Sequence, residues 1–115
     1  MKEQGIFVFW YEFLDWLLDK TEKFPKKSRF TIVSRIDNLG LDIMEGLVIA
    51  SYSGRDKKIR ILKDINIKLE RLRVLLRLSS KRKFINLTSF EYAMRKVDEC
   101  GKMVGGWIKE RERQQ

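Results

Sequence analysis

Apolar residues recur at steps of three and four along most of this chain, the spacing that places them on one face of an α-helix. The repeat is interrupted near Pro25, Gly54 and Thr88, residues that begin or end helices. The pattern predicts four helices, over residues 5–23, 25–53, 57–83 and 89–109. With loops this short, they form an all-α, antiparallel up-down-up-down four-helix bundle in one domain, residues 1–115.

Helix boundaries and core positions follow from the same pattern. Pro25 suits the first turn of the second helix and Gly54 its end, while Asp56 is the expected N-cap of the third. Thr88 and Glu91 form a capping box that opens the fourth, and the polar tail after Lys109 is expected to fray. The predicted core comprises Ile6, Phe7, Trp10, Phe13, Leu14, Leu17 and Leu18; Ile32, Ile36, Leu39, Ile43, Leu47 and Ala50; Leu62, Ile65, Leu69, Leu72 and Leu76; and Phe90, Met94, Val97, Gly101, Val104 and Ile108.

The third helix carries a second apolar strip, made of Ile67, Val74 and Leu78, roughly opposite the Leu62/Leu76 seam. One bundle core cannot bury both. The first helix is also over-supplied with aromatics, including Phe9 and Trp16. These residues predict a homo-oligomer interface formed by Phe9, Trp16, Ile67, Val74 and Leu78; the alternative is scattered surface aliphatics, which are common on monomers.

Charge is concentrated in one segment. The formal net charge is +9, and residues 57–83 hold eleven Lys or Arg against Asp64 and Glu70, so the rest of the chain is neutral. A cationic ridge of this kind is typical of polyanion binding, and a solvated helix face is the plain alternative. The candidate nucleic-acid-binding residues are Arg60, Lys63, Arg71, Arg73, Arg77, Lys81, Arg82 and Lys83, among which Arg73, Arg77 and Lys81 repeat at four-residue steps. No base-reading motif is visible, so binding of RNA or DNA is expected to be mostly independent of sequence.

Catalytic chemistry is scarce. The chain has no histidine, its single Cys100 lies beside a core stripe, and its glycines form no phosphate-binding loop. We therefore predict no enzyme activity, no cofactor and no metal site. A lone cysteine suggests a reducing compartment. Because Glu12 and Asp15 interrupt the apolar stretch of residues 6–18, which is too short to span a bilayer, we expect a cytoplasmic protein without membrane contact.

Three segments resemble the accessory variability determinant (Avd) proteins of diversity-generating retroelements: residues 24–31 (FPKKSRFT), 69–78 (LERLRVLLRL) and 92–109, which ends in GKMVGGWIK. Their order and spacing extend the likeness over about residues 13–109. The wider group includes the four-helix-bundle proteins encoded by intervening sequences in bacterial ribosomal RNA genes. One departure is the third-to-fourth helix turn, where relatives often have histidine and this chain reads SSKRKF over residues 79–84.

The resemblance implies a basic four-helix protomer that forms a homopentameric barrel and has no chemistry of its own. It would bind the element's reverse transcriptase and nucleic acid, template RNA or cDNA, and so support mutagenic retrohoming. The alternative is a structural helical oligomer, or an intervening-sequence-type bundle protein, whose basic ridge binds an acidic protein partner or ribosomal RNA.

Overall fold

The backbone of residues 2–114 and the side chains of residues 5–114 are described by a computed structural model. The described residues form four α-helices: α1 (Lys2–Glu22), α2 (Ser34–Ser51), α3 (Arg55–Lys81) and α4 (Leu87–Arg113). A 3-10 turn, η1 (Lys26–Ser28), and a π-helical turn, η2 (Arg29–Val33), connect α1 to α2. These helices, with no strand among the described residues, confirm the predicted all-α fold.

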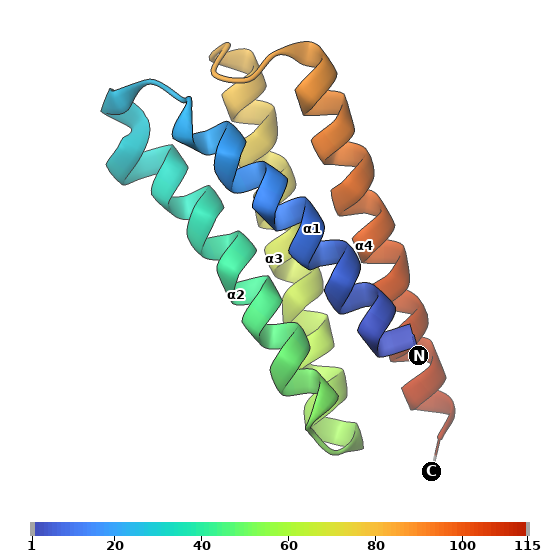
Figure 1. Ribbon diagram of the computed structural model, residues 1–115. Helices are drawn as coiled ribbons and strands as arrows, with labels where there is room; N and C mark the ends of the chain where they lie inside the picture. The colour runs from blue at the N-terminus through green and yellow to red at the C-terminus, as the bar shows by residue number, and fades with distance from the viewer. Residues whose placement is uncertain (1, 115) are drawn as a thin grey trace.

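Each helix packs against the next in the chain, and α4 closes the bundle against α1 (Figure 1). The α1–α2 and α3–α4 connections lie at one end of the bundle, and the α2–α3 turn lies at the other, with the start of α1 and the end of α4. The molecule measures 49 × 24 × 20 Å. Because α1 and α3 lie at diagonal corners of the bundle, their outer faces point away from one another.

The core is continuous and mostly aliphatic, and it includes the fully buried Trp10. The indole N–H of Trp10 donates a hydrogen bond of 2.9 Å to the carbonyl oxygen of Gly40, which joins α1 to α2. Gly40 permits this approach, because a Cβ there would lie 2.5 Å from Leu14 Cδ1. The five predicted seam residues of α3 are all buried, whereas Phe7, Leu18, Ile32, Phe90 and Met94 lie only partly inside.

Three predicted boundaries were wrong, each because of the chain's local geometry. Pro25 precedes η1, and α2 begins only at Ser34. The eight residues before Ser34 form the 3-10 turn η1, which is tighter than an α-helix, and the π-helical turn η2, which is wider. Gly54, in an extended conformation, precedes α3, so that Asp56 lies in the first turn and not at the N-cap. Asn86 caps α4 by accepting a 2.8 Å hydrogen bond from the Ser89 N–H, in place of the Thr88/Glu91 capping box.

The end of α4 was also mispredicted. This helix continues four residues beyond Lys109, to Arg113. Arg55 explains the extension, because its guanidinium donates hydrogen bonds to the carbonyl oxygens of Arg111 and Gln114, at 3.0 and 2.7 Å. These carbonyls are among those that a helix C-terminus leaves without a partner, so Arg55 fixes the last turn.

Candidate interaction surface on α3

The outer face of α3 displays three aliphatic side chains in a line. Ile67, Val74 and Leu78 are 60%, 54% and 42% exposed, whereas Leu62, Leu69 and Leu76 on the inner face are fully buried. The helix is therefore apolar on two sides, as predicted from the sequence. We call Ile67, Val74 and Leu78 the α3 strip.

Cations flank the α3 strip on both sides. Five exposed basic residues of α3 form no ion pair with any side chain that the structure describes: Lys57, Arg60, Arg71, Arg77 and Lys81. Arg60 lies on the α2 side, where it lines a cleft with Asp42 and Glu45. Arg77 lies on the α4 side, one turn beyond Arg73, which contacts α4 directly. Free guanidinium and ammonium groups on one face are what a polyanion requires.

Arg73 does not belong to this free set. Its Nε donates a 2.8 Å hydrogen bond to Asp98 on α4, and its Nη1 lies 3.0 Å from Glu70. The side chain is only 19% exposed, and it lies over Gly101, where a Cβ would come within 3.0 Å of Nη2. The predicted track of Arg73, Arg77 and Lys81 is therefore shortened to its last two members, and Arg73 joins α3 to α4.

The remaining candidate cations are distributed differently. Lys63 forms a 3.4 Å ion pair with Glu112 near the end of α4. Arg82 packs over the ring of Phe84, 5.8 Å from its centroid. Lys83 is exposed in the α3–α4 turn, in the left-handed region with φ 61°, a conformation that commonly ends helices. Arg82 and Lys83 thus lie just beyond the end of α3, whereas Lys63 lies within the helix, one turn before Ile67.

Phe9 and Trp16, predicted to be interface residues, are both half-buried within the protomer. Trp16 packs against Tyr92 of α4, with ring centroids 4.6 Å apart, and Phe9 lies under the ammonium group of Lys96 at 5.0 Å. Both rings turn toward α4 and pack on the core, so little of either is free for a second chain. Their role in an interface between copies stays a prediction, because each ring keeps only part of its surface exposed.

Exposed apolar residues on α1 and α2 include Val8 and Tyr11 of α1 and Leu41 and Val48 of α2. Tyr11 and Leu41 adjoin Trp10 and Gly40, whose hydrogen bond joins the two helices, so they lie at the same level. We call these four residues the α1–α2 strip. The sequence contained a signal for this exposed face that the analysis of apolar residues missed. Glu12, Asp15 and Asp19 follow Val8 at steps of three and four, which places them on one exposed face of α1.

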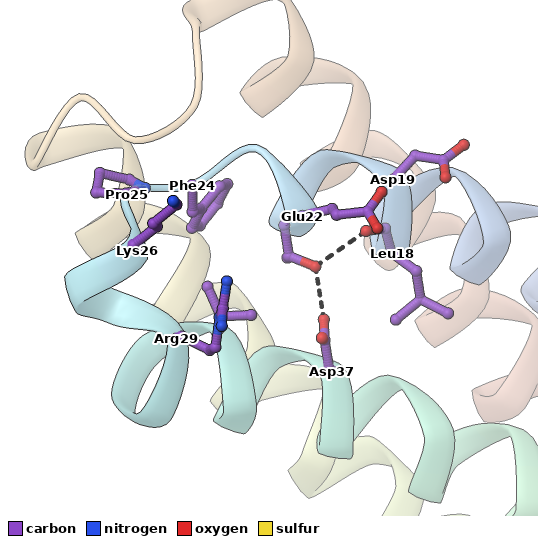
Figure 2. A pocket seen from close by; sticks show the side chains of 10 residues that line it. Leu18, Asp19, Glu22, Phe24, Pro25, Lys26, Arg29 and Asp37 are labelled. Carbon is purple, nitrogen blue, oxygen red and sulfur yellow. Dashed lines mark hydrogen bonds between the residues drawn. The ribbon is translucent and has the colours of Figure 1, made fainter.

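A cleft of about 620 Å³ lies between α1, the connection after it and the start of α2 (Figure 2). The Thr21 hydroxyl lies 2.7 Å from Asp37 Oδ1 and 3.2 Å from the Leu18 carbonyl oxygen. Burial raises the pKa of the Asp37 carboxyl, although the hydrogen bond from Thr21 opposes this shift. Asp19, Glu22, Lys26 and Arg29 mix both signs of charge around the cleft, which therefore favours no single class of ligand.

Cys100 is fully buried between the helices. Burial raises the pKa of its thiol to about 12, with a smaller opposing effect from nearby Arg73. At neutral pH the sulfur is a protonated, inaccessible core group, unlike the exposed, acidic thiol of a cysteine nucleophile. Within residues 2–114 there is no group of three metal-ligating side chains, and no helix there is long and apolar enough to cross a membrane.

The fold and this surface define a small, basic four-helix-bundle protein with exposed cations and aliphatics on the outer face of α3. Residues 3–111 match the model of the bAvd-like family, and this match covers nearly the whole chain. The chain therefore belongs to the bAvd-like family, which confirms the resemblance found in the sequence.

A solved structure supports the fold independently. The chain is similar to a crystal structure of a protein of unknown function from the S23 ribosomal protein family of Bacteroides thetaiotaomicron. The two share 18% identity with a TM-score of 0.87, over 95% of this chain and 99% of the other. At this identity the likeness shows the bundle fold alone. A sequence search of curated proteins gives no match.

Proposed function

We propose that this protein is a non-catalytic accessory subunit of a diversity-generating retroelement, which binds the element's reverse transcriptase and nucleic acid during mutagenic retrohoming. Membership of the bAvd-like family carries this proposal. The outer face of α3 supports the nucleic-acid part, because five cations there have no carboxylate partner among the described residues.

Arg77 and Lys81 are the residues best placed to contact phosphates. They lie one turn apart on the α4 side of the α3 strip, so they can follow a nucleic-acid backbone without covering the aliphatics. Each contact would add affinity mostly by releasing counterions, with little preference for sequence. Self-association into a pentamer, as the resemblance implies, would bring several such pairs to one RNA and raise the affinity through avidity.

The test measures RNA binding over a salt series. A labelled single-stranded RNA of mixed sequence is titrated with the wild-type protein and with the double variant Arg77→Glu/Lys81→Glu. The double variant should bind far more weakly, and the salt slope should fall by roughly 0.7 for each phosphate that the protein no longer neutralises. Lys26→Glu/Lys27→Glu is the matched control, because it makes the same charge change on exposed residues at the α1–α2 connection.

The possible outcomes separate the proposal from its rival. Equal weakening by both variants would indicate only a nonspecific effect of net charge, and would contradict a phosphate site on α3. Unchanged affinity and salt slope in Arg77→Glu/Lys81→Glu would favour the structural oligomer whose ridge binds an acidic protein.

Binding to the polymerase requires its own experiment. A reverse transcriptase encoded beside this protein should co-purify with it from cells that express both. The flanking sequence should also contain paired variable and template repeats. A genome locus without a reverse-transcriptase gene would contradict the proposal directly.

A further inference from the structure

We propose that one end of the bundle docks the protein on the surface of an anionic lipid bilayer. The inference goes beyond the proposed function and uses residues away from the outer face of α3. This end consists of residues 23–35, at the α1–α2 connection, and residues 82–90, at the α3–α4 connection, which lie at the same end in Figure 1. The rings of Phe24 and Phe84, with centroids 5.7 Å apart, join the two segments. We call these two segments the basic end.

The basic end holds seven basic residues and no acidic one. All seven are exposed, and none forms an ion pair with a side chain among residues 5–114: Lys23, Lys26, Lys27, Arg29, Arg35, Arg82 and Lys83. Glu22 and Glu91 adjoin the two segments, so acids meet this charge only at its border. A cluster of about four to eight Lys or Arg is typical of surfaces that bind anionic lipid headgroups.

Two large apolar side chains project into solvent from the basic end. Phe30, in the π-helical turn η2, is 86% exposed, and Leu87, at the start of α4, is 66% exposed. Among the large apolar residues that the structure describes, only Tyr52, at the other end of the bundle, is more exposed than Phe30. Apolar side chains surrounded by cations fit a membrane surface, because the acyl boundary takes the apolar groups while the lipid phosphates meet the cations.

The apolar pair favours lipid over nucleic acid at the basic end. Phosphates attract the seven cations in either case. A base can stack on the ring of Phe30, but the branched aliphatic side chain of Leu87 has no flat face on which a base could stack. A bilayer takes up both side chains, and each gains the free energy of leaving water. Nucleic acid is therefore the rival occupant that the experiment has to separate.

Docking of this kind requires no spanning helix. The sequence-based expectation of no membrane contact concerned residues 6–18, which are too short to span a bilayer, and no helix within residues 2–114 could cross one. A surface contact needs only the end of the bundle, across which the molecule measures 24 and 20 Å. The sides of the bundle, including Arg77 on α3, then stay open to nucleic acid.

The test measures binding to vesicles by co-sedimentation. Vesicles of phosphatidylglycerol and phosphatidylcholine in equal parts should bind the wild-type protein, whereas vesicles of phosphatidylcholine alone should not. Phe30→Ser keeps every charge and should lower the partition coefficient about tenfold, because it removes an inserted ring. Tyr52→Ser, which removes an exposed aromatic ring from the other end of the bundle, is the matched control and should bind as the wild type does.

A pair of charge variants tests the cations. Lys26→Glu/Lys27→Glu should lower the partition coefficient by at least about 25-fold, since each basic residue near an anionic surface contributes roughly fivefold. Arg77→Glu/Lys81→Glu makes the same change of net charge on α3 and should lose much less. Because all four residues are exposed, circular dichroism should show unchanged helix content in both variants.

Fluorescence quenching measures insertion directly and does not depend on the charge variants. In Phe30→Trp, lipids that carry bromine at the headgroup end of the acyl chains should quench the added tryptophan, relative to the quenching of the wild type. Tyr52→Trp should show no added quenching, because that end of the bundle points away from the bilayer.

Contrary results are equally definite. A wild type that does not bind the anionic vesicles, equal losses in the two charge variants, or unchanged vesicle binding by Phe30→Ser would each overturn the proposal. A Phe30→Ser variant that lost RNA affinity but kept its vesicle binding would show that the basic end binds nucleic acid instead. We expect Phe30→Ser to bind RNA as the wild type does, and Arg77→Glu/Lys81→Glu to lose RNA but keep most vesicle binding. Failure of this proposal can thus be distinguished from failure of the proposed function.

Discussion

The two faces of α3 differ in how far the protomer itself covers their side chains. The inner face consists of aliphatic residues with a single buried serine, Ser79, whose hydroxyl donates 2.8 Å to the carbonyl oxygen of Leu75. The outer face holds the α3 strip and unpaired cations. The side chains of the inner face are packed and hydrogen-bonded within the protomer. The aliphatic and cationic side chains of the outer face remain exposed. The residues that stabilise the fold and those proposed to act in function thus lie on opposite sides of one helix.

This contrast explains why the outer face of α3 can be basic without weakening the bundle. Exposed charges contribute little to the free energy of unfolding, whereas each buried aliphatic contributes about 1.5–3 kcal/mol. The following predictions test whether the division between buried and exposed residues holds.

The largest effect of burial is expected at Cys100, on the inner side of α4. In the folded protein, alkylation of its thiol at pH 8 should be on the order of 10³-fold slower than in denaturant, because reaction requires unfolding. Since the folded pKa is raised from 9.0 to about 12, the free energy of unfolding should also fall as the pH rises from 9 toward 12. Cys100→Ala should lose this part of the pH dependence. Rapid labelling of the native protein would show that the core opens locally.

The next largest contrast lies across α3 itself. Leu69→Ala, at a fully buried position, should reduce the free energy of unfolding by about 2–5 kcal/mol. Ile67→Ala, two residues away on the outer face, should change protomer stability by only about 0.5 kcal/mol. Urea denaturation at a protein concentration low enough to dissociate any assembly measures both. Similar losses at both positions would mean that Ile67 is covered.

A third test compares two arginines one turn apart. Arg73→Ala removes the ion pairs with Asp98 and Glu70, and should reduce the free energy of unfolding by about 1–2 kcal/mol. Arg77→Ala, which breaks no ion pair with a described residue, should cost less than about 0.5 kcal/mol. RNA affinity should show the opposite order, with Arg77→Ala weaker in binding. Equal effects in both assays would remove the distinction between a structural and a functional arginine.

The fold could be predicted from the sequence because the inner faces of the helices repeat at regular steps. Leu62, Ile65, Leu69, Leu72 and Leu76 were all placed correctly in the core, because alternating steps of three and four residues keep them on one face of the helix. The exposure of the α3 strip was also predictable, because its members lie opposite that seam.

The site was less predictable, because spacing along one helix does not show what the neighbouring helix supplies. Arg73 and Arg77 look equivalent in the sequence, and only the position of Asp98 on α4 separates them. Trp16 was predicted as an interface residue without knowledge of Tyr92, against which its ring packs. The α1–α2 strip was missed altogether, since its members come from two helices that meet at Gly40.

The smallest effect is expected at Asp37, which lies between the buried and exposed extremes beside the cleft of Figure 2. Because burial raises its pKa above 3.8, ionisation of Asp37 opposes folding, and its contribution to stability falls as the pH rises through the folded pKa. Asp37→Asn should therefore raise the free energy of unfolding at pH 7, while the amide oxygen still accepts the Thr21 hydrogen bond. The gain should shrink as the pH falls below 3.8, where Asp37 is protonated in both states. Thermal denaturation at several pH values measures it, with the exposed Asp15→Asn as the control for lost charge. A loss of stability in Asp37→Asn at pH 7 would show instead that the Thr21 contact requires the carboxylate, and that this residue belongs with the satisfied interior.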